Sequence, residues 1–171
     1  MVHDQDHSKR VKLLALYIAE REGGDQKVIE MAADLHDIAR DCENHAIEGA
    51  KIAEDLLRKK GYPEDFIRKV CHCIEAHSFS SKVEPKTLEA KILSDADKLD
   101  AMGAIGIARA FMFAGERGES LEDVLNHFEA KLLKLKDFLY TETAKKLAKS
   151  RHKFLEEFYR RLIDEIRGVS F

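Results

Sequence analysis

The chain has few of the residues on which disulfide-rich and zinc-finger proteins depend. Its 171 residues include three cysteines, two prolines and no tryptophan. Cys42, Cys71 and Cys73 are odd in number and form no CxxC pair, so we expect free thiols in a reducing cytoplasm. The run Cys71-His72-Cys73 has no accompanying CxxC or HxxxH motif, and a zinc site is therefore not predicted there.

Long apolar runs and an excess of basic residues are also missing. No apolar stretch approaches the roughly 18 residues that a membrane-spanning helix needs, and the first residues form no cationic, apolar leader. We therefore expect a cytoplasmic protein without a membrane partner. The 29 basic and 32 acidic residues give a net charge of −3, so no global basic field attracts nucleic acid, although a local patch stays open.

Helical periodicity dominates the sequence. Hydrophobic residues make up 44% of the chain and charged residues 36%, a balance typical of helix-rich globular proteins. Apolar residues recur every three or four positions in the segments 11–18, 28–35, 47–57, 66–74, 88–99 and 128–166. No strand-like alternation of useful length occurs. The prediction is an all-α protein, a single-domain irregular helical bundle that spans residues 1–171.

Turn and capping residues predict where several helices begin and end. Gly23-Gly24 should end the first helix, and Asp25 and Asn44 should cap the second and third. Residues 78–85 are expected to form a loop, and residues 115–118 a turn. Loops and turns thus separate the predicted helices at regular intervals.

The segment from Ala101 to Ala108 is apolar on nearly all sides, which predicts a helix buried in the core. Gly103 and Gly106 lie three positions apart, so a neighbouring helix could approach this face closely. After the turn, the run from Ser120 to Asp123 has the spacing of a capping box. The last third is expected to be amphipathic helix.

The residues with the clearest chemistry are His7, His36, Asp37 and Asp97, which come from three separate helical segments. Imidazoles and carboxylates together suit a divalent transition metal. His36 and Asp37 are adjacent, so in mid-helix their side chains would diverge by about 100°. Both could reach one ion at the last helical turn, where the backbone opens. Arg10, on the face of His7, would repel a metal unless an anion such as phosphate lay between them.

Each piece alone has a simpler interpretation. A lone histidine or a His-Asp pair is usually a hydrogen-bonded structural group. The run from Asp95 to Asp100 could be a charged helix end. Their joint occurrence in this order is what favours a metal site.

These residues resemble the H…HD…D signature of the HD-domain superfamily of metal-dependent phosphohydrolases, with His7, His36-Asp37 and Asp97 in the signature positions. Further motifs are similar to those of a small bacterial and archaeal subgroup that includes nucleoside triphosphate pyrophosphohydrolases. They are His3-Asp4-x-x-His7-x-x-Arg10-Val11, Leu35-His36-Asp37-Ile38, His45-x-x-x-Gly49-Ala50, Ile74-x-x-His77-Ser78-Phe79 and Asp95-Ala96-Asp97-Lys98-Leu99-Asp100-Ala101-x-Gly103-Ala104-x-Gly106. The resemblance covers nearly the whole chain.

The resemblance implies an HD-domain fold with one divalent ion held by His7, His36, Asp37 and Asp97. Asp95 flanks the same turn and stays a rival for the last place, although the family pattern uses the position of Asp97. Imidazole ligands with open positions favour manganese, with iron, cobalt, nickel or magnesium as alternatives.

Superfamily members with two metals take extra histidines from the next two helices, where His45 and His77 fall. These two could hold a second metal, contact a phosphate, or be polar residues at helix ends. The remaining histidines have no comparable context and are expected to be ordinary surface or packing residues: His3, His72, His127 and His152.

Arg10, Arg40, Lys98 and Arg109 are the cations nearest the signature residues. Lys98 adjoins Asp97 and is expected to be catalytic. The three arginines are expected to bind substrate phosphate, or to be surface charges or structural ion pairs.

Some superfamily members carry a glutamate three residues after the HD aspartate, where this chain has Arg40. The role of that glutamate in orienting water is therefore assigned here to Asp37 or Asp100.

The expected activity is metal-dependent hydrolysis of a small phosphate ester, in particular a nucleotide, with a nucleoside triphosphate cleaved to monophosphate and diphosphate as one form. The alternatives are a phosphodiesterase or nucleotidase of the same superfamily, a di-iron oxygenase, and a nucleotide-binding module that holds a metal for structure alone. The sequence leaves open the base, the cleaved bond, the metal and whether the protein is a homo-oligomer.

Overall fold

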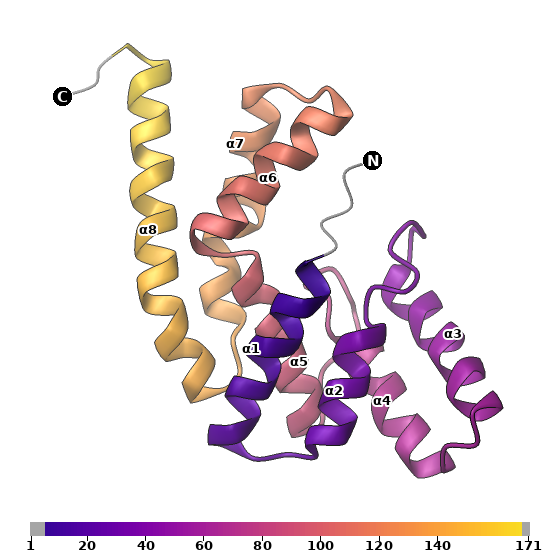
Figure 1. The fold of residues 1–171 in the computed structure, drawn as a ribbon. Helices are drawn as coiled ribbons and strands as arrows, with labels where there is room; N and C mark the ends of the chain where they lie inside the picture. Colours follow the sequence, from indigo (N-terminus) through magenta and orange to yellow (C-terminus); the bar gives the residue numbers. More distant parts are fainter. Residues whose placement is uncertain (1–5, 169–171) are drawn as a thin grey trace.

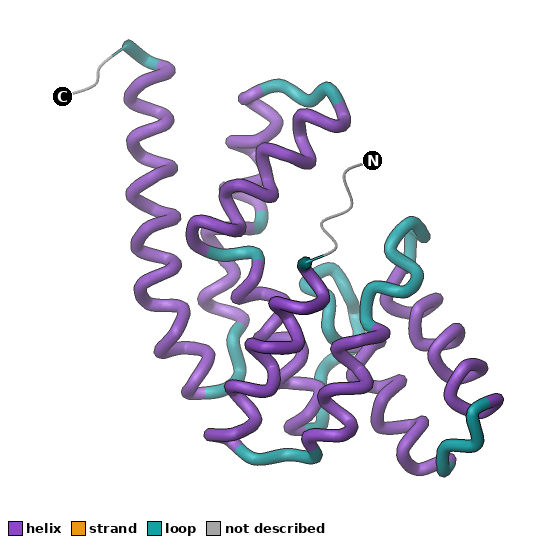
Figure 2. Tube along the Cα trace, viewed as in Figure 1, coloured by secondary structure: helices purple, strands orange, loops and turns teal. Residues whose placement is uncertain are grey.

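The computed structural model describes residues 6–168, and this range is helix and loop throughout, without a strand (Figure 2). The helices are α1 (His7–Glu22), α2 (Gln26–Leu35), α3 (His45–Lys59), α4 (Glu64–Ala76), α5 (Leu88–Asp100), α6 (Gly103–Arg117), α7 (Leu121–Ala130), the 3₁₀ helix η1 (Leu132–Phe138) and α8 (Glu142–Ile166). The predicted all-α bundle is confirmed. None of the described helices is both long and apolar enough to cross a membrane.

The first half of the chain forms a compact group around α5. Helices α1, α2 and α4 pack against α5, α2 also packs against both α1 and α4, and α3 packs on the outer side of α4 (Figure 1). Large aliphatic side chains fill the space between them, and Ile18, Ile29, Ile74 and Leu93 are completely buried. Burial of such side chains stabilises the arrangement by about 2 kcal/mol each.

The second half extends along one side of this group. Helix α8 runs the length of the molecule at the edge opposite α3 and contacts α6, η1, α5 and α1 (Figure 1). The ring of Phe128 on α7 stacks on Phe158 and Tyr159 of α8 and holds α7 against that helix. Residues 132–138 form a 3₁₀ helix rather than the predicted α-helix, and Phe154, predicted to face inward, is 49% exposed.

Most predicted helix ends are confirmed. Asp25 caps α2 by accepting backbone N–H bonds, and Ser120 and Asp123 form the predicted capping box of α7. Asn44 occupies the N-cap position of α3 as predicted, but its side chain makes no capping hydrogen bond. Thr87 caps α5, which the sequence analysis did not predict.

The prediction of a fully buried helix over 101–108 is wrong. Helix α6 is amphipathic, and its Ile105 is 45% exposed. The helix also continues through Gly115, where a turn was predicted, and ends at Gly118, whose φ is +66°. The predicted close approach is present at Gly103, where an added Cβ would lie 3.2 Å from the Arg151 Cβ of α8.

Candidate functional site

The centre of the candidate site is a pair of buried imidazoles. His7 begins α1 and His36 directly follows α2, and their Nε2 atoms lie 3.3 Å apart. Because α1 and α2 are neighbouring helices joined by a short turn, the start of one lies beside the end of the other. Both side chains are almost completely shielded from solvent.

Two carboxylates complete this group. Asp37 Oδ2 lies 3.6 Å from His7 Nε2, and Asp97 Oδ1 lies 3.4 Å from the same atom. His36 and Asp37 converge because α2 ends at Leu35 and the chain passes into turns from residue 36 to residue 42. The structure thus brings His7, His36 and Asp37 together in one group and places Asp97 against His7.

The hydrogen bonds of the imidazoles test whether a metal fits. His36 Nδ1 lies 2.8 Å from the carbonyl oxygen of Ala33 and must donate to it, since a carbonyl only accepts. His7 Nδ1 likewise lies 2.7 Å from Asp100 Oδ2. In the neutral rings the two facing Nε2 atoms then carry lone pairs, which repel each other unless a cation lies between them. The donor set therefore fits a divalent metal.

Asp37 also belongs to a second group. One ligand atom each from Asp37, His45 and His77 lies within 4.8 Å of the others, as is also true of His7, His36 and Asp37. His77 Nδ1 donates to the Ile74 carbonyl oxygen at 2.6 Å, so its Nε2 has the same bare lone pair. Among the described residues there are thus two groups of side chains that could hold a metal ion, and Asp37 belongs to both.

The electrostatics of the site keep the carboxylates charged. Burial opposes ionisation of Asp97, but its hydrogen bond with His7 and the charges of His77 and His7 lower its pKa well below the ordinary value. Burial lowers the pKa of His77 from 6.5 to about 4, so this ring is neutral at pH 7. Burial also disfavours a charged His7, yet its bonds with Asp100 and Asp97 raise its pKa. Neutral imidazoles and ionised carboxylates are the forms that bind metals, so a metal that binds His7 would displace a proton from a ring that its carboxylate partners otherwise help to protonate.

Asp100 lies behind His7 rather than in the cavity. Asp100 is 1% exposed. Its carboxylate accepts hydrogen bonds from Arg10 Nε at 2.6 Å and from Arg109 Nη1 at 2.6 Å, in addition to the bond with His7. These contacts occupy both of its oxygens. A direct catalytic contact by Asp100 does not fit this position, and Arg10, which binds it, does not line the cavity.

Lys98 and Asp95 also point away from the site. Lys98 is 4% exposed and its Nζ donates to Ser94 Oγ at 2.5 Å, so the predicted catalytic role does not fit its position. Asp95 accepts hydrogen bonds from Tyr140 N, Thr141 N and Thr141 Oγ1 at the start of α8, and it is not a candidate ligand. Adjacent residues of a helix diverge, so Asp97 faces the ligand group while its neighbours in α5 do not.

The ligand groups open into a cavity of about 390 Å³, a size within the range of small-molecule sites. Arg40 lines it and donates to Asp37 Oδ2 at 3.2 Å, and Arg109 lines it while paired with Asp100. Arg40 and Arg109 therefore both line the cavity, each in contact with a carboxylate, and their binding of substrate phosphate stays a prediction.

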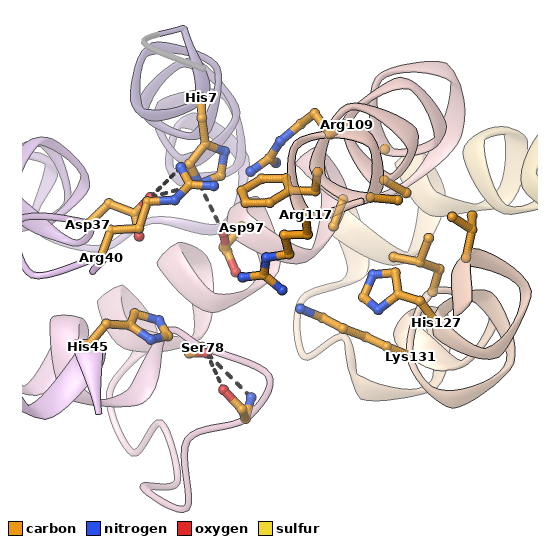
Figure 3. A pocket seen from close by; sticks show the side chains of 18 of the residues that line it. His7, Asp37, Arg40, His45, Ser78, Asp97, Arg109, Arg117, His127 and Lys131 are labelled. Atoms are coloured by element: carbon orange, nitrogen blue, oxygen red, sulfur yellow. Dashed lines mark hydrogen bonds and ion pairs between the residues drawn. The ribbon is translucent and has the colours of Figure 1, made fainter. Parts of the chain in front are cut away.

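Sequence analysis missed the opposite wall of this cavity. Arg117, His127 and Lys131 line it, and Figure 3 shows His127 and Lys131 facing Asp37 and His45 across the space. His127 was expected to be an ordinary surface or packing residue. Its separation of four residues from Lys131, which places both on one helix face, was the available signal.

The other histidines match their expected structural roles. His72 Nε2 accepts a hydrogen bond from Lys86 N, and the buried His152 lies 2.9 Å from Glu156. His3, with its motif His3-Asp4, lies outside the described residues.

Comparison with known proteins identifies the family. A model of the HD domain matches residues 5–102. YpgQ of Bacillus subtilis (strain 168) is 41% identical over 177 residues, which cover 98% of this chain and 86% of YpgQ. The crystal structure of YpgQ in complex with ADP has a TM-score of 0.81 at 38% identity, covering 98% of this chain and 92% of that one.

Two further relatives agree with this match. The crystal structure of an HD-superfamily hydrolase from Bacillus thuringiensis has a TM-score of 0.76 at 38% identity, covering 96% of this chain and 87% of that one. Ribonuclease Y of Alkaliphilus metalliredigens is 31% identical over 125 residues, which cover 72% of this chain but 25% of that longer protein. The chain belongs to the HD domain family.

Proposed function

We propose that the chain is a metal-dependent phosphohydrolase that acts on nucleotides. The observation that carries this proposal is one cavity lined both by the ligand groups around His7 and Asp37 and by the cations Arg40, Arg117 and Lys131. A dianionic or polyanionic substrate would meet positive charge on both sides. The family supports a metal-dependent phosphohydrolase, and the ADP in the YpgQ crystal structure supports a nucleotide as the ligand.

The residues that would hold the metal are His7, His36, Asp37 and Asp97. Two imidazoles and two carboxylates favour manganese in our proposal, over iron, cobalt, nickel or magnesium. When bound, a divalent ion would polarise a phosphoryl oxygen and lower the pKa of its water ligand. His45 and His77 would hold a second ion or donate to a phosphate oxygen.

The chain's own residues orient the reaction. Asp100 fixes the ring of His7, and the Ala33 carbonyl fixes the ring of His36, so both Nε2 atoms point to one place. Asp37 is the half-buried carboxylate that belongs to both histidine groups, and we assign to it the acceptance of a proton from the attacking water. Arg40 donates to Asp37 and can stabilise the negative charge that spreads over the phosphoryl oxygens.

The finer substrate assignment is a nucleoside triphosphate cleaved to monophosphate and diphosphate. The resemblance to pyrophosphohydrolases and the nucleotide in the YpgQ structure support it. The second histidine group around His77 gives one alternative a specific basis, namely a di-iron oxygenase. A cytoplasmic location stays a prediction.

A metal-by-substrate screen tests this function. Wild-type protein loaded with Mn²⁺ or Co²⁺ should release phosphate or diphosphate from a nucleotide panel, with the products identified by chromatography. The double variant His36→Ala, Asp37→Ala should lose at least about a hundredfold in rate. Asp41→Ala, which removes an exposed carboxylate from the same turn, should keep the activity. Equal inertness of wild type and double variant towards every ester would overturn the proposal, and oxygen uptake by the iron-loaded protein would favour the oxygenase.

A further inference from the structure

Three side chains form what we call the far wall: Arg117 at the end of α6, His127 in the last turn of α7, and Lys131 directly after α7. They line the same cavity as the ligand groups, but they come from the second half of the chain, whereas the ligand groups come from α1 to α5 and the turns between them. In Figure 3 His127 and Lys131 lie across the cavity from Asp37 and His45. The cavity therefore has a second polar region apart from the ligand groups.

The positive charge of the far wall is weakly compensated. Among the described residues, no carboxylate lies within 4 Å of Lys131 Nζ, which lies 5.9 Å from the centre of the Phe79 ring. Arg117 pairs with Glu119 at 3.6 Å, and both side chains are exposed, so water screens this pair. Burial and the nearby Lys131 lower the pKa of His127, which makes its ring a neutral hydrogen-bonding group at pH 7.

The cations beside the ligand groups differ in this respect. Arg40 donates to Asp37, and Arg109 donates to the buried Asp100. Each of these charges is therefore already partly compensated by a carboxylate. On the far wall an anion that enters the cavity would meet Lys131, which has no carboxylate partner among the described residues, and Arg117, whose pair with Glu119 is screened by water.

We infer that the far wall, through Lys131 and Arg117, binds the phosphate groups beyond the one that is cleaved. This inference rests on the proposed hydrolysis, because it places the reacting phosphate at the ligand groups. A monophosphate bound at the ligand groups would leave the cations of the far wall without an anion. Lysine binds phosphate as a point charge, and a neutral imidazole can donate one hydrogen bond to it.

Binding experiments test this inference without turnover. Calorimetric titrations in Mn²⁺ compare α,β-methylene-ATP with AMP on wild type, Lys131→Met and Lys134→Met. Lys134 is an exposed lysine of η1 that does not line the cavity, so its variant is a matched control. Lys131→Met should lower the affinity for α,β-methylene-ATP about tenfold to a hundredfold and leave the affinity for AMP unchanged. Lys134→Met should change neither affinity. If Lys131→Met lacks a cooperative unfolding transition, Arg117→Met supplies the same comparison.

Several results would overturn the inference. One is an equal loss of affinity for both nucleotides in Lys131→Met, as expected if the far wall binds the base. Another is unchanged affinity for both nucleotides in that variant. The third is a wild type that binds AMP as tightly as α,β-methylene-ATP. Hydrolysis of bis(p-nitrophenyl) phosphate, which has no second phosphate, separates this failure from that of the proposed function. If the wild type hydrolyses this ester but Lys131→Met shows no selective loss of affinity for α,β-methylene-ATP, only the inference is overturned. If that selective loss is found but the wild type hydrolyses no ester, only the proposed hydrolysis is overturned.

Discussion

The Nδ1 atom of His7 lies 2.7 Å from Asp100 Oδ2, and this buried contact points the other ring nitrogen at His36. Carboxylates that hold a ligating histidine in this way raise its basicity and fix its tautomer. Burial disfavours a charged Asp100, but its bonds with His7 and Arg10 lower its pKa to about 2, so it is ionised at neutral pH. Asp100 is therefore a positioning residue for the candidate metal ligand.

Asp100→Asn should weaken metal binding. The amide cannot supply the negative charge that orients His7, so we expect Mn²⁺ affinity to fall about tenfold to a hundredfold in calorimetric titrations. Asp164→Asn, on the exposed surface of α8, should have no effect. An Asp100→Asn protein with native circular dichroism and unaltered Mn²⁺ affinity would refute this positioning role.

Substitution of Asp97 should affect metal binding, whereas substitution of Asp95 should affect the stability of the fold. Asp97→Asn should abolish tight Mn²⁺ binding and leave thermal stability nearly unchanged. Asp95→Ala should destabilise the protein by about 3 kcal/mol, because it leaves the N–H groups of Tyr140 and Thr141 without acceptors. Calorimetry and chemical denaturation measure both quantities, and the reverse pattern would make Asp95 the ligand.

Lys98→Met should retain activity. Lys98 Nζ donates to Ser94 inside the protein, and Met fills a similar volume, so we expect kcat within about threefold of wild type. A loss of about a hundredfold in kcat, with stability unchanged, would instead support the catalytic role that its position beside Asp97 predicted.

The metal-free protein should lose stability in mild acid. Burial depresses the native pKa of His77 from 6.5 to about 4, so as the pH falls the unfolded state takes up the proton first. The contribution of neutral His77 is complete above pH 6.5 and is lost towards pH 4, by up to about 3 kcal/mol. Urea denaturation with EDTA at several pH values measures this slope, which should flatten in His77→Gln. Identical slopes in both proteins would contradict this account.

Sequence predicted the fold well because helical periodicity and capping are local signals. The apolar spacing of 11–18 and the cap at Asp25 needed no tertiary information. The burial of Ile105 could not be judged in the same way, because it depends on which faces of α6 other helices cover. The sequence pattern of an apolar helix does not indicate which of its positions are exposed to solvent.

The ligand residues could be found because the order His7, His36-Asp37, Asp97 matches a signature, and the structure brings these residues together. Their neighbours could not be assigned by adjacency. Lys98 and Asp100 lie beside Asp97 in sequence, yet one points into the protein and the other behind His7. The far wall was missed since only the packing of α6 and α7 brings it to the cavity.

Anomalous diffraction from crystals grown with Mn²⁺ tests the central claim most directly. The account predicts a manganese peak within bonding distance of Nε2 of His7 and His36 and of carboxylate oxygens of Asp37 and Asp97. Crystals without a peak there, or with the ion bound elsewhere while these four side chains remain as described, would contradict it.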